Sequence, residues 1–164
     1  RAARATARAV LEEGLALARV GRWRQSMIWG IHGLGLVAFF EQDYGTARSY
    51  FEDGLTLCGQ LGNRTFAAFS LEGLAMTVAA QGQPARAAQL CGAAHRLRQT
   101  INAAVPAFVR PIYERLVMNL QAQLGEEAYR ALWEQGQAMT IEQVMRVGKT
   151  AGIFSPGGEE KHQL

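Results

Sequence analysis

Apolar residues recur every three to four positions along most of the chain, and short polar or glycine-containing turns interrupt them. This spacing places apolar side chains on one face of an α-helix, so we expect a series of amphipathic helices. Turns at Gln42–Tyr44, Gly62–Asn63 and Gly82–Pro84 separate long periodic stretches, and Pro84 suits the first position of a helix. The pattern predicts eight helices, at roughly 2–19, 23–41, 45–60, 64–81, 85–102, 107–123, 126–136 and 140–150.

The helical stretches repeat with a period of about 40 residues. One alanine position shows this spacing, at Ala7, Ala47 and Ala87. Two further sets of positions align at the same period, namely Leu11, Phe51 and Cys91, and Gly14, Gly54 and Ala94. Each unit therefore consists of a helix, a short turn and a second helix. Units of this kind bury their apolar faces by stacking on one another.

The chain contains 18 glycines, many for a helical protein, because a glycine inside a helix costs about 1 kcal/mol relative to alanine. The repeat predicts two uses for them. Close contacts between helices are expected at Gly14, Gly33, Gly35, Gly54 and Gly73. Turns are expected at Gly21, Gly62, Gly82 and Gly125.

The repeat unit resembles the tetratricopeptide repeat, in which small residues allow two antiparallel helices to approach. The matching positions of the first unit are Leu34, Gly35, Tyr44, Ala47 and Phe51. Those of the second unit are Leu74, Ala75, Pro84, Ala87 and Cys91. The period of this chain is longer than the usual tetratricopeptide period of about 34 residues. In this respect the chain is similar to the longer repeats of the maltose-regulator type. The resemblance implies an all-α fold of stacked antiparallel helix pairs, a short right-handed solenoid of seven or eight helices.

A second resemblance covers residues 88–147. The segment Ala88–Arg98 and the later segments Leu124–Tyr129 and Trp133–Val144 resemble blocks that close the repeat domain of large bacterial regulators, with Thr140 as a helix N-cap. Such parents combine a signalling ATPase with a LuxR-type or other output domain. The resemblance implies a cytoplasmic, non-catalytic sensing domain that binds a protein, peptide or small-molecule effector, or the attached domains of its own parent.

The boundaries follow from the loss of helical periodicity near the end of the sequence. Residues 1–151 are predicted to form the repeat domain, and residues 152–164 a flexible polar tail or linker that contains glycine and proline. Because residue 1 is Arg1 rather than methionine, we expect the chain to be part of a longer protein.

One set of residues indicates a binding surface, because the first helix of each pair lines the concave side of a stacked repeat. The candidate positions are Trp29, His32, Leu36 and Phe39, and one period later Phe69, Glu72 and Met76. Trp29 is expected beside Phe69, and His32 beside Glu72. Such a surface suits a peptide, a helix or a small molecule. The alternative interpretation is that these side chains simply pack in the core.

Composition supports the helical prediction, since 27 Ala and 17 Leu outnumber 9 Val and 6 Ile. No apolar run approaches the ~20 residues of a membrane span. Cys58 and Cys91 belong to no metal-binding spacing and are predicted to be small buried residues. The segment Gly148–Thr150 mimics the end of a phosphate-binding loop but lacks the required earlier glycine. We therefore expect no metal, no cofactor and no enzymatic activity.

Charge leaves one alternative function open. The net charge is +3, six arginines lie in the segment from Arg1 to Arg24, and no acidic residue lies between Glu72 and Glu114. An arginine-rich face could serve a nucleic-acid-associated module. The competing interpretation is solvated helix faces, because domains that bind phosphate usually carry a denser basic patch.

Overall fold

The computed structural model describes residues 2–107, 109–140 and 143–144. All regular secondary structure in this part is helical, which confirms the predicted all-α class. The helices are α1 (Ala2–Val20), α2 (Arg24–Phe40), α3 (Tyr44–Leu61), α4 (Arg64–Ala80), α5 (Pro84–Thr100), α6 (Arg110–Leu124) and α7 (Glu126–Ala138). The largest difference from the predicted boundaries is at α6, which begins at Arg110 instead of 107.

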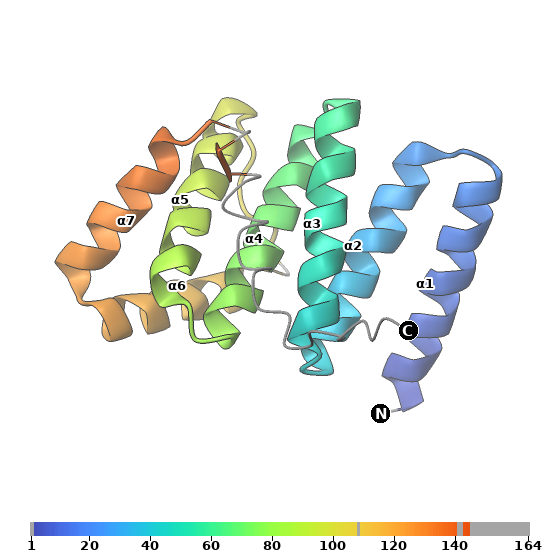
Figure 1. Ribbon diagram of the computed structural model, residues 1–164, viewed down its shortest axis with the longest axis horizontal. Coiled ribbons are helices and arrows are strands. Elements are labelled where there is room, and N and C mark those ends of the chain that lie inside the picture. Colours follow the sequence, from blue (N-terminus) through green and yellow to red (C-terminus); the bar gives the residue numbers. More distant parts are fainter. Residues whose placement is uncertain (1, 108, 141–142, 145–164) are drawn as a thin grey trace, which may run out of the picture.

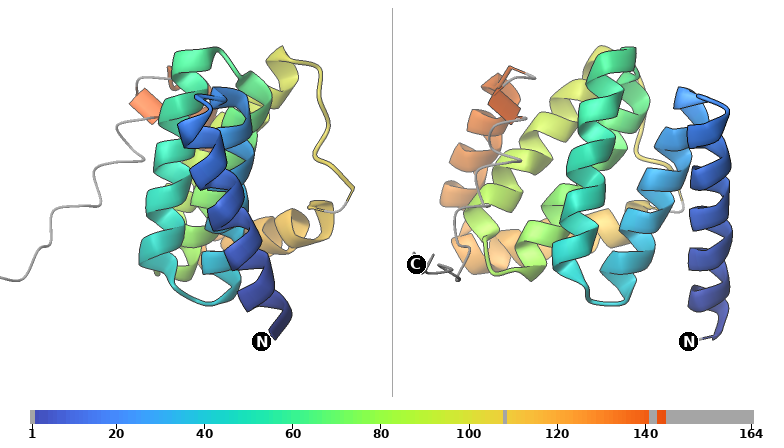
Figure 2. Two further views of the ribbon diagram at one scale, coloured as in Figure 1. Left: turned by 90° about the vertical axis from the view of Figure 1, so that its right-hand side faces the viewer. Right: turned by 45° about the vertical axis from the view of Figure 1, so that its right-hand side comes forward.

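Helices α1 to α5 lie side by side in chain order and alternate in direction (Figure 1). Each packs on the next, and α2 also contacts α4. The last two helices depart from this pattern. Helix α6 crosses the row at a steep angle (Figure 2), and α7 packs along α5 in the same direction as α5. Helices α6 and α7 therefore do not form a further antiparallel pair in the row: α6 contacts both α5 and α7, and α7 packs directly on α5.

The same turn ends each of the first five helices. It contains one residue with a positive φ of 49° to 76°, at the evenly spaced positions Arg22, Gln42, Gly62, Gly82 and Asn102. The amide of the next residue then donates to the carbonyl oxygen five residues earlier, over 2.8–3.0 Å. This Schellman-type bond satisfies a carbonyl at the helix end and fixes the reversal of the chain.

Side-chain caps start two of the following helices. The Asp43 carboxylate accepts from the amide of Thr46 at 3.1 Å, and the Asn63 side chain accepts from the amide of Phe66 at 3.0 Å. Both caps lie in turns that the sequence predicts, at Gln42–Tyr44 and Gly62–Asn63. After α7, the hydroxyl of Thr140 accepts from the amide of Gln143 at 3.2 Å, as expected for an N-cap. Most of the predicted eighth helix and the whole tail at 152–164 lie outside the described residues.

Phe51 is the centre of the core between α2, α3 and α4. Its fully buried ring lies against Gly35 of α2 and Gly73 of α4, and a Cβ atom at either position would lie 2.8 Å or 2.4 Å from it. A Cβ atom on Gly33 would likewise lie 2.8 Å from the side chain of Leu11. These contacts confirm the predicted role of small residues in close helix packing.

The glycine prediction is wrong at one position. A Cβ atom on Gly14 would meet no atom within 4 Å, because this side of α1 is open. Gly54 is correctly assigned, since a Cβ atom there would lie 3.1 Å from the Ser70 hydroxyl. The predicted turn glycines all lie between helices, and Gly125 has a φ of 81°.

Two glycines that the repeat did not single out make the closest approach among the glycines of the described helices. A Cβ atom on Gly92 of α5 would lie 1.9 Å from the carbonyl oxygen of Trp133 in α7. A Cβ atom on Gly136 of α7 would lie 1.9 Å from the carbonyl oxygen of Gln89 in α5. The two helices thus cross with backbone touching backbone. None of the helices described is long and apolar enough to cross a membrane.

Candidate functional site

An open groove of about 610 Å³ lies between α1, α2 and α4, and we call it the aromatic groove. Its main lining side chains are Val10, Leu11 and Leu15 from α1, Trp29, His32 and Leu36 from α2, and Phe66 and Phe69 from α4. The lining is predominantly apolar, with one imidazole at its floor. A volume of this size falls in the range of ligand sites, about 300–1,000 Å³.

Helical spacing gathers these side chains. Trp29, His32 and Leu36 are three and four residues apart on α2, so they share one face of that helix. Gly30 and Gly33 lie between these positions and allow α1 to approach α2 closely. A Cβ atom on Gly30 would lie 3.1 Å from the Cβ atom of Leu15. The small residues of α2 thereby bring the α1 wall of the groove close to its floor.

Trp29 forms the rim of the groove and is the most exposed aromatic side chain there, at 64%. Its ring meets Phe66 edge-on, with the centroids 4.5 Å apart and the planes at 67°. Phe66 in turn lies 5.5 Å from Phe69 between ring centroids. Three aromatic rings therefore form a continuous wall from the rim inward, of which the outermost remains in solvent.

His32 lies at the floor of the groove among aromatic rings. Its imidazole centroid is 5.4 Å from that of Phe69, 5.5 Å from that of Phe51 and 6.0 Å from that of Phe66. The Nδ1 atom is buried and has no hydrogen-bond partner among the described residues. Burial lowers the pKa of His32 from 6.5 to about 4, so the ring is neutral at neutral pH. A neutral imidazole with a free nitrogen offers one polar contact inside an apolar groove.

Acidification is expected to destabilise the protein through His32. The folded-state pKa lies below the unfolded-state value, so only the unfolded chain takes up the proton as the pH falls below 6.5. The contribution is intact above pH 6.5 and is lost as the pH falls toward 4. Between pH 7.5 and pH 5 we expect a loss of about 2 kcal/mol in the free energy of unfolding, measured by urea denaturation. His32→Leu should show a clearly smaller loss over the same interval, and an equal loss would contradict the assignment.

The structure brings together four of the seven side chains predicted from the sequence: Trp29, His32, Leu36 and Phe69 all line the aromatic groove. The other three lie elsewhere. Phe39 packs against the rings of Phe40 and Tyr44 at 5.6 Å and 5.7 Å. Met76 is buried, with 6% of its surface exposed.

Glu72 is the third side chain outside the groove. Its carboxylate accepts from Nε and Nη2 of Arg98 at 2.5 Å and 2.8 Å, and both side chains are buried. Arg98 also donates to the carbonyl oxygen of Ala104 at 3.1 Å, and its guanidinium lies 4.9 Å from the centroid of Phe69. The expected neighbour of Glu72 was His32, but a buried carboxylate needs a charged partner, and α5 supplies one.

Sequence reasoning missed four of the main lining residues, namely Val10, Leu11, Leu15 and Phe66, because it considered only the predicted concave positions of α2 and α4. Val10, Leu11 and Leu15 belong to α1, a second helix in the repeat scheme. Phe66 precedes Phe69 by three residues on the same face of α4 and was not considered. The i, i+3 spacing of the two phenylalanines was the signal that could have found it.

A second cavity of about 470 Å³ lies among α3, α4 and α5, and Met139, Thr140 and Val144 complete its lining. Cys58 contributes to its lining. Burial raises the pKa of the Cys58 thiol to about 11 and that of the Cys91 thiol to about 12, so both thiols stay protonated. Both cysteines are free and buried, as predicted. The described residues contain no group of three His, Cys, Asp or Glu side chains that could hold a metal ion.

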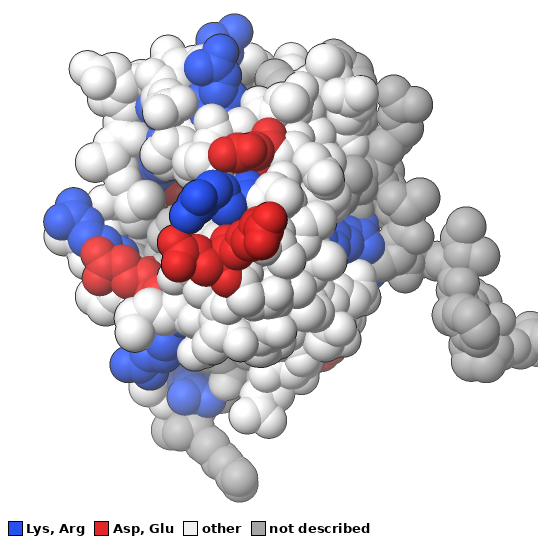
Figure 3. Space-filling view, turned by 90° about the vertical axis from the view of Figure 1, so that its left-hand side faces the viewer, with Lys and Arg blue, Asp and Glu red and all other residues white. Residues whose placement is uncertain are grey.

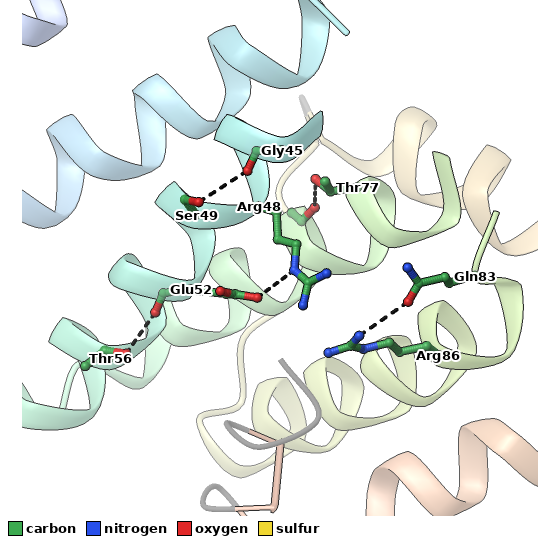
Figure 4. A network of polar contacts seen from close by, with 9 residues as sticks. Gly45, Arg48, Ser49, Glu52, Thr56, Thr77, Gln83 and Arg86 are labelled. Atoms are coloured by element: carbon green, nitrogen blue, oxygen red, sulfur yellow. Dashed lines mark hydrogen bonds and ion pairs between the residues drawn. The ribbon is translucent and has the colours of Figure 1, made fainter. Parts of the chain in front are cut away.

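Charged side chains are dispersed over the helix faces. Figure 4 shows Arg48 of α3 and Arg86 of α5 pointing toward one another, with Glu52 bound to Arg48 at 2.7 Å. Burial, followed by the charge of Arg48, lowers the pKa of Arg86. Acidic and basic side chains alternate on the face of the α7 end (Figure 3), where α7 contributes the exposed ion pair Arg130–Glu126. That face therefore carries no single-sign patch among the described residues.

Among known proteins, no family model, no curated protein and no solved structure matches the chain.

Proposed function

We propose that the chain is a non-catalytic interaction domain that binds its partner or effector in the aromatic groove. The observation that carries the proposal is the exposed ring of Trp29 at the rim of an apolar groove. Tryptophan is enriched among the residues that dominate binding energy, and a contiguous exposed apolar surface is a common mark of an interaction site. The neutral imidazole of His32 supplies a polar contact that would orient the ligand.

The proposed architecture is a short right-handed solenoid similar to the tetratricopeptide repeat. Its support is the recurring turn, which reverses the chain after each helix from α1 to α5, and the contact between α2 and α4. In such a solenoid these first helices line the inner surface, and both contribute to the aromatic groove. A peptide or a helix that lies across α2 and α4 would contact Trp29 and Phe69 together.

The proposed biological role is signal sensing in a cytoplasmic bacterial regulator, such as a LuxR-type transcriptional regulator or a signalling ATPase. Its support is the resemblance of the segments Ala88–Arg98 and Trp133–Val144 to blocks of such proteins. The two segments lie far apart in the sequence, yet they meet where Gly92 crosses α7. In this role the groove receives a protein, peptide or small-molecule signal, and the attached domains produce the output.

The binding proposal predicts a strong dependence on Trp29. A random peptide library displayed on phage is panned against the immobilised chain, and enriched peptides are measured by fluorescence anisotropy. Trp29→Ala should weaken binding about tenfold or more, because the rim of the groove is lost. Its melting temperature should stay close to that of the wild type, since the side chain is largely exposed.

Trp23→Ala is the matched control, because Trp23 is equally exposed, at 62%, and does not line the groove. Equal weakening by both variants, or enriched peptides that bind Trp29→Ala normally, would contradict the proposal. The nucleic-acid alternative predicts instead retention of duplex DNA at low salt with a steep salt dependence. Two arginines of α1 are already engaged within the chain, Arg4 with the carbonyl oxygen of Phe40 and Arg8 with Glu41.

A further inference from the structure

Helix α1 occupies the same place in the repeat as α3 and α5 and buries Leu15 and Ala18, yet part of its apolar surface is open. Val10 is 63% exposed, whereas Leu90, two periods later, is 1% exposed. Leu17 is 59% exposed, whereas Leu57, one period later, is 9% exposed. Ala7 is exposed as well, although Ala47 and Ala87 are fully buried. No described residue covers the face of α1 that corresponds to the buried faces of α3 and α5.

The contacts of α3 show what covers this face in a complete unit. Phe51 of α3 lies between Gly73 of the following helix and Gly35 of the preceding helix. Its equivalent in α1 is Leu11, which contacts Gly33, the equivalent of Gly73. The contact that corresponds to Gly35 has no counterpart in the described residues, since it would come from a helix on the open side of α1.

Gly14 and Gly54 give the same result independently. A Cβ atom on Gly54 would lie 3.4 Å from Ile31 of α2, whereas one on Gly14 would meet nothing within 4 Å. In α3 the preceding helix, α2, supplies this contact through Ile31. The open side of α1 thus lacks what α2 provides to α3.

The aromatic groove coincides with this open position. The groove residues Ser26 and Trp29 of α2 correspond to Phe66 and Phe69 of α4, one period later. The ring of His32 in α2 covers both phenylalanines. Leu11 of the groove corresponds to Phe51, which His32 also contacts. The groove therefore has the outline of the surface that α2 occupies one unit later.

We infer that the aromatic groove and the open face of α1 form one docking surface for an amphipathic α-helix of a partner protein. The inference rests on the proposed function and names the class of partner. The helix lies antiparallel to α1, as α2 does to α3, and continues the packing that α2 and α4 establish.

The chemistry of the docked helix follows from the two helices that already perform this role. Several positions are buried in both helices: Ile28, Ile31, Leu34, Gly35 and Ala38 of α2, and one period later Ala68, Leu71, Leu74, Ala75 and Val78 of α4. Both sets combine large apolar residues with one small residue, Gly35 or Ala75, that directly follows a leucine. The partner helix thus carries Gly or Ala opposite Leu11, and apolar residues three and four positions on either side.

The probe is a fluorescein-labelled synthetic peptide with the sequence of residues 63–81, the change Glu72→Gln and three added lysines for solubility. The change is needed because Ala18 of α1 stands where α5 has Arg98, so a carboxylate would have no partner. A control peptide additionally carries Leu71→Asp and Leu74→Asp. Fluorescence anisotropy against the intact chain should show saturable binding of the probe, and binding of the control peptide at least tenfold weaker.

Variants of α1 test the position of the docked helix. Val10→Asp and Leu17→Asp should each weaken binding of the probe about tenfold, while Ala16→Asp, an exposed change on the opposite side of α1, should leave it within twofold. All three positions are exposed, and circular dichroism should show wild-type helix content. The inference would be overturned if the probe bound Val10→Asp and Leu17→Asp as tightly as the wild type, or if it did not bind the wild type at all.

The two proposals can fail separately. If library peptides bind in a manner that depends on Trp29 but not on Val10, the groove functions and the helix-docking inference is wrong. If sedimentation shows a dimer that Val10→Asp dissociates, the occupant is a second copy of the chain, which also overturns the inference. Loss of both dependences would contradict the proposed function itself.

Discussion

Replacing Gly92 with alanine is expected to lower the free energy of unfolding by about 3 kcal/mol or more. The added Cβ atom would lie 1.9 Å from the carbonyl oxygen of Trp133, and this obstacle is helix backbone, which cannot rotate away as a side chain can. Helices α5 and α7 must therefore separate along their crossing. Urea denaturation gives the free energy, and near-ultraviolet circular dichroism reports the environment of Trp133, whose ring lies 4.9 Å from that of His95.

Gly59→Ala is the matched control for this prediction. Gly59 also lies inside a helix, but a Cβ atom there would meet nothing within 4 Å. Helix propensity alone should then stabilise the protein by up to about 1 kcal/mol. If Gly92→Ala is as stable as Gly59→Ala, the close crossing of α5 and α7 is wrong.

Replacing Arg98 with alanine is expected to cost about 3–5 kcal/mol, because it leaves the Glu72 carboxylate buried without a cation. The substitution also removes the donor to the Ala104 carbonyl oxygen, which ties the connection between α5 and α6 to the core. The guanidinium additionally supports the ring of Phe69 from behind the aromatic groove. Thermal and urea denaturation measure the loss.

Two comparisons separate the buried charge from other effects. Arg130→Ala breaks an ion pair whose side chains are 63% and 77% exposed, and it should change stability little. The double variant Glu72→Leu with Arg98→Met removes both charges and should be more stable than Arg98→Ala alone. A double variant that is less stable than Arg98→Ala would contradict the argument from buried charge.

The helices, and the part of the groove that α2 alone forms, could be predicted from the sequence because they depend on short-range patterns. Apolar spacing placed α1 to α5 and α7 to within about two residues, and one helix face gathered Trp29, His32 and Leu36. The repeat period correctly predicted close helix contacts at Gly35 and Gly73, both of which lie against Phe51. Such features need only one helix, or two that are adjacent in the chain.

The features that sequence reasoning missed depend on partners distant in the chain. Nothing near Glu72 in the sequence indicates that Arg98 will approach it from the next helix, so its lone charge suggested a binding role. The crossing of Gly92 and Gly136 arises because α6 turns across the row and lets α7 pack on α5. The open side of Gly14 depends on whether a helix covers it, which a repeat pattern alone does not reveal.

The turn that recurs after each of the first five helices makes the chain modular in length. Because the same left-handed residue and the same backbone hydrogen bond end each of these helices, two turns that are one repeat period apart are geometrically interchangeable. A duplication or deletion joined at such turns would keep every flanking helix in its direction and on its side of the row. A change by a single helix would instead reverse the direction of the helices that follow it. Evolution can therefore lengthen or shorten this domain without redesigning its junctions, provided that it moves in whole pairs.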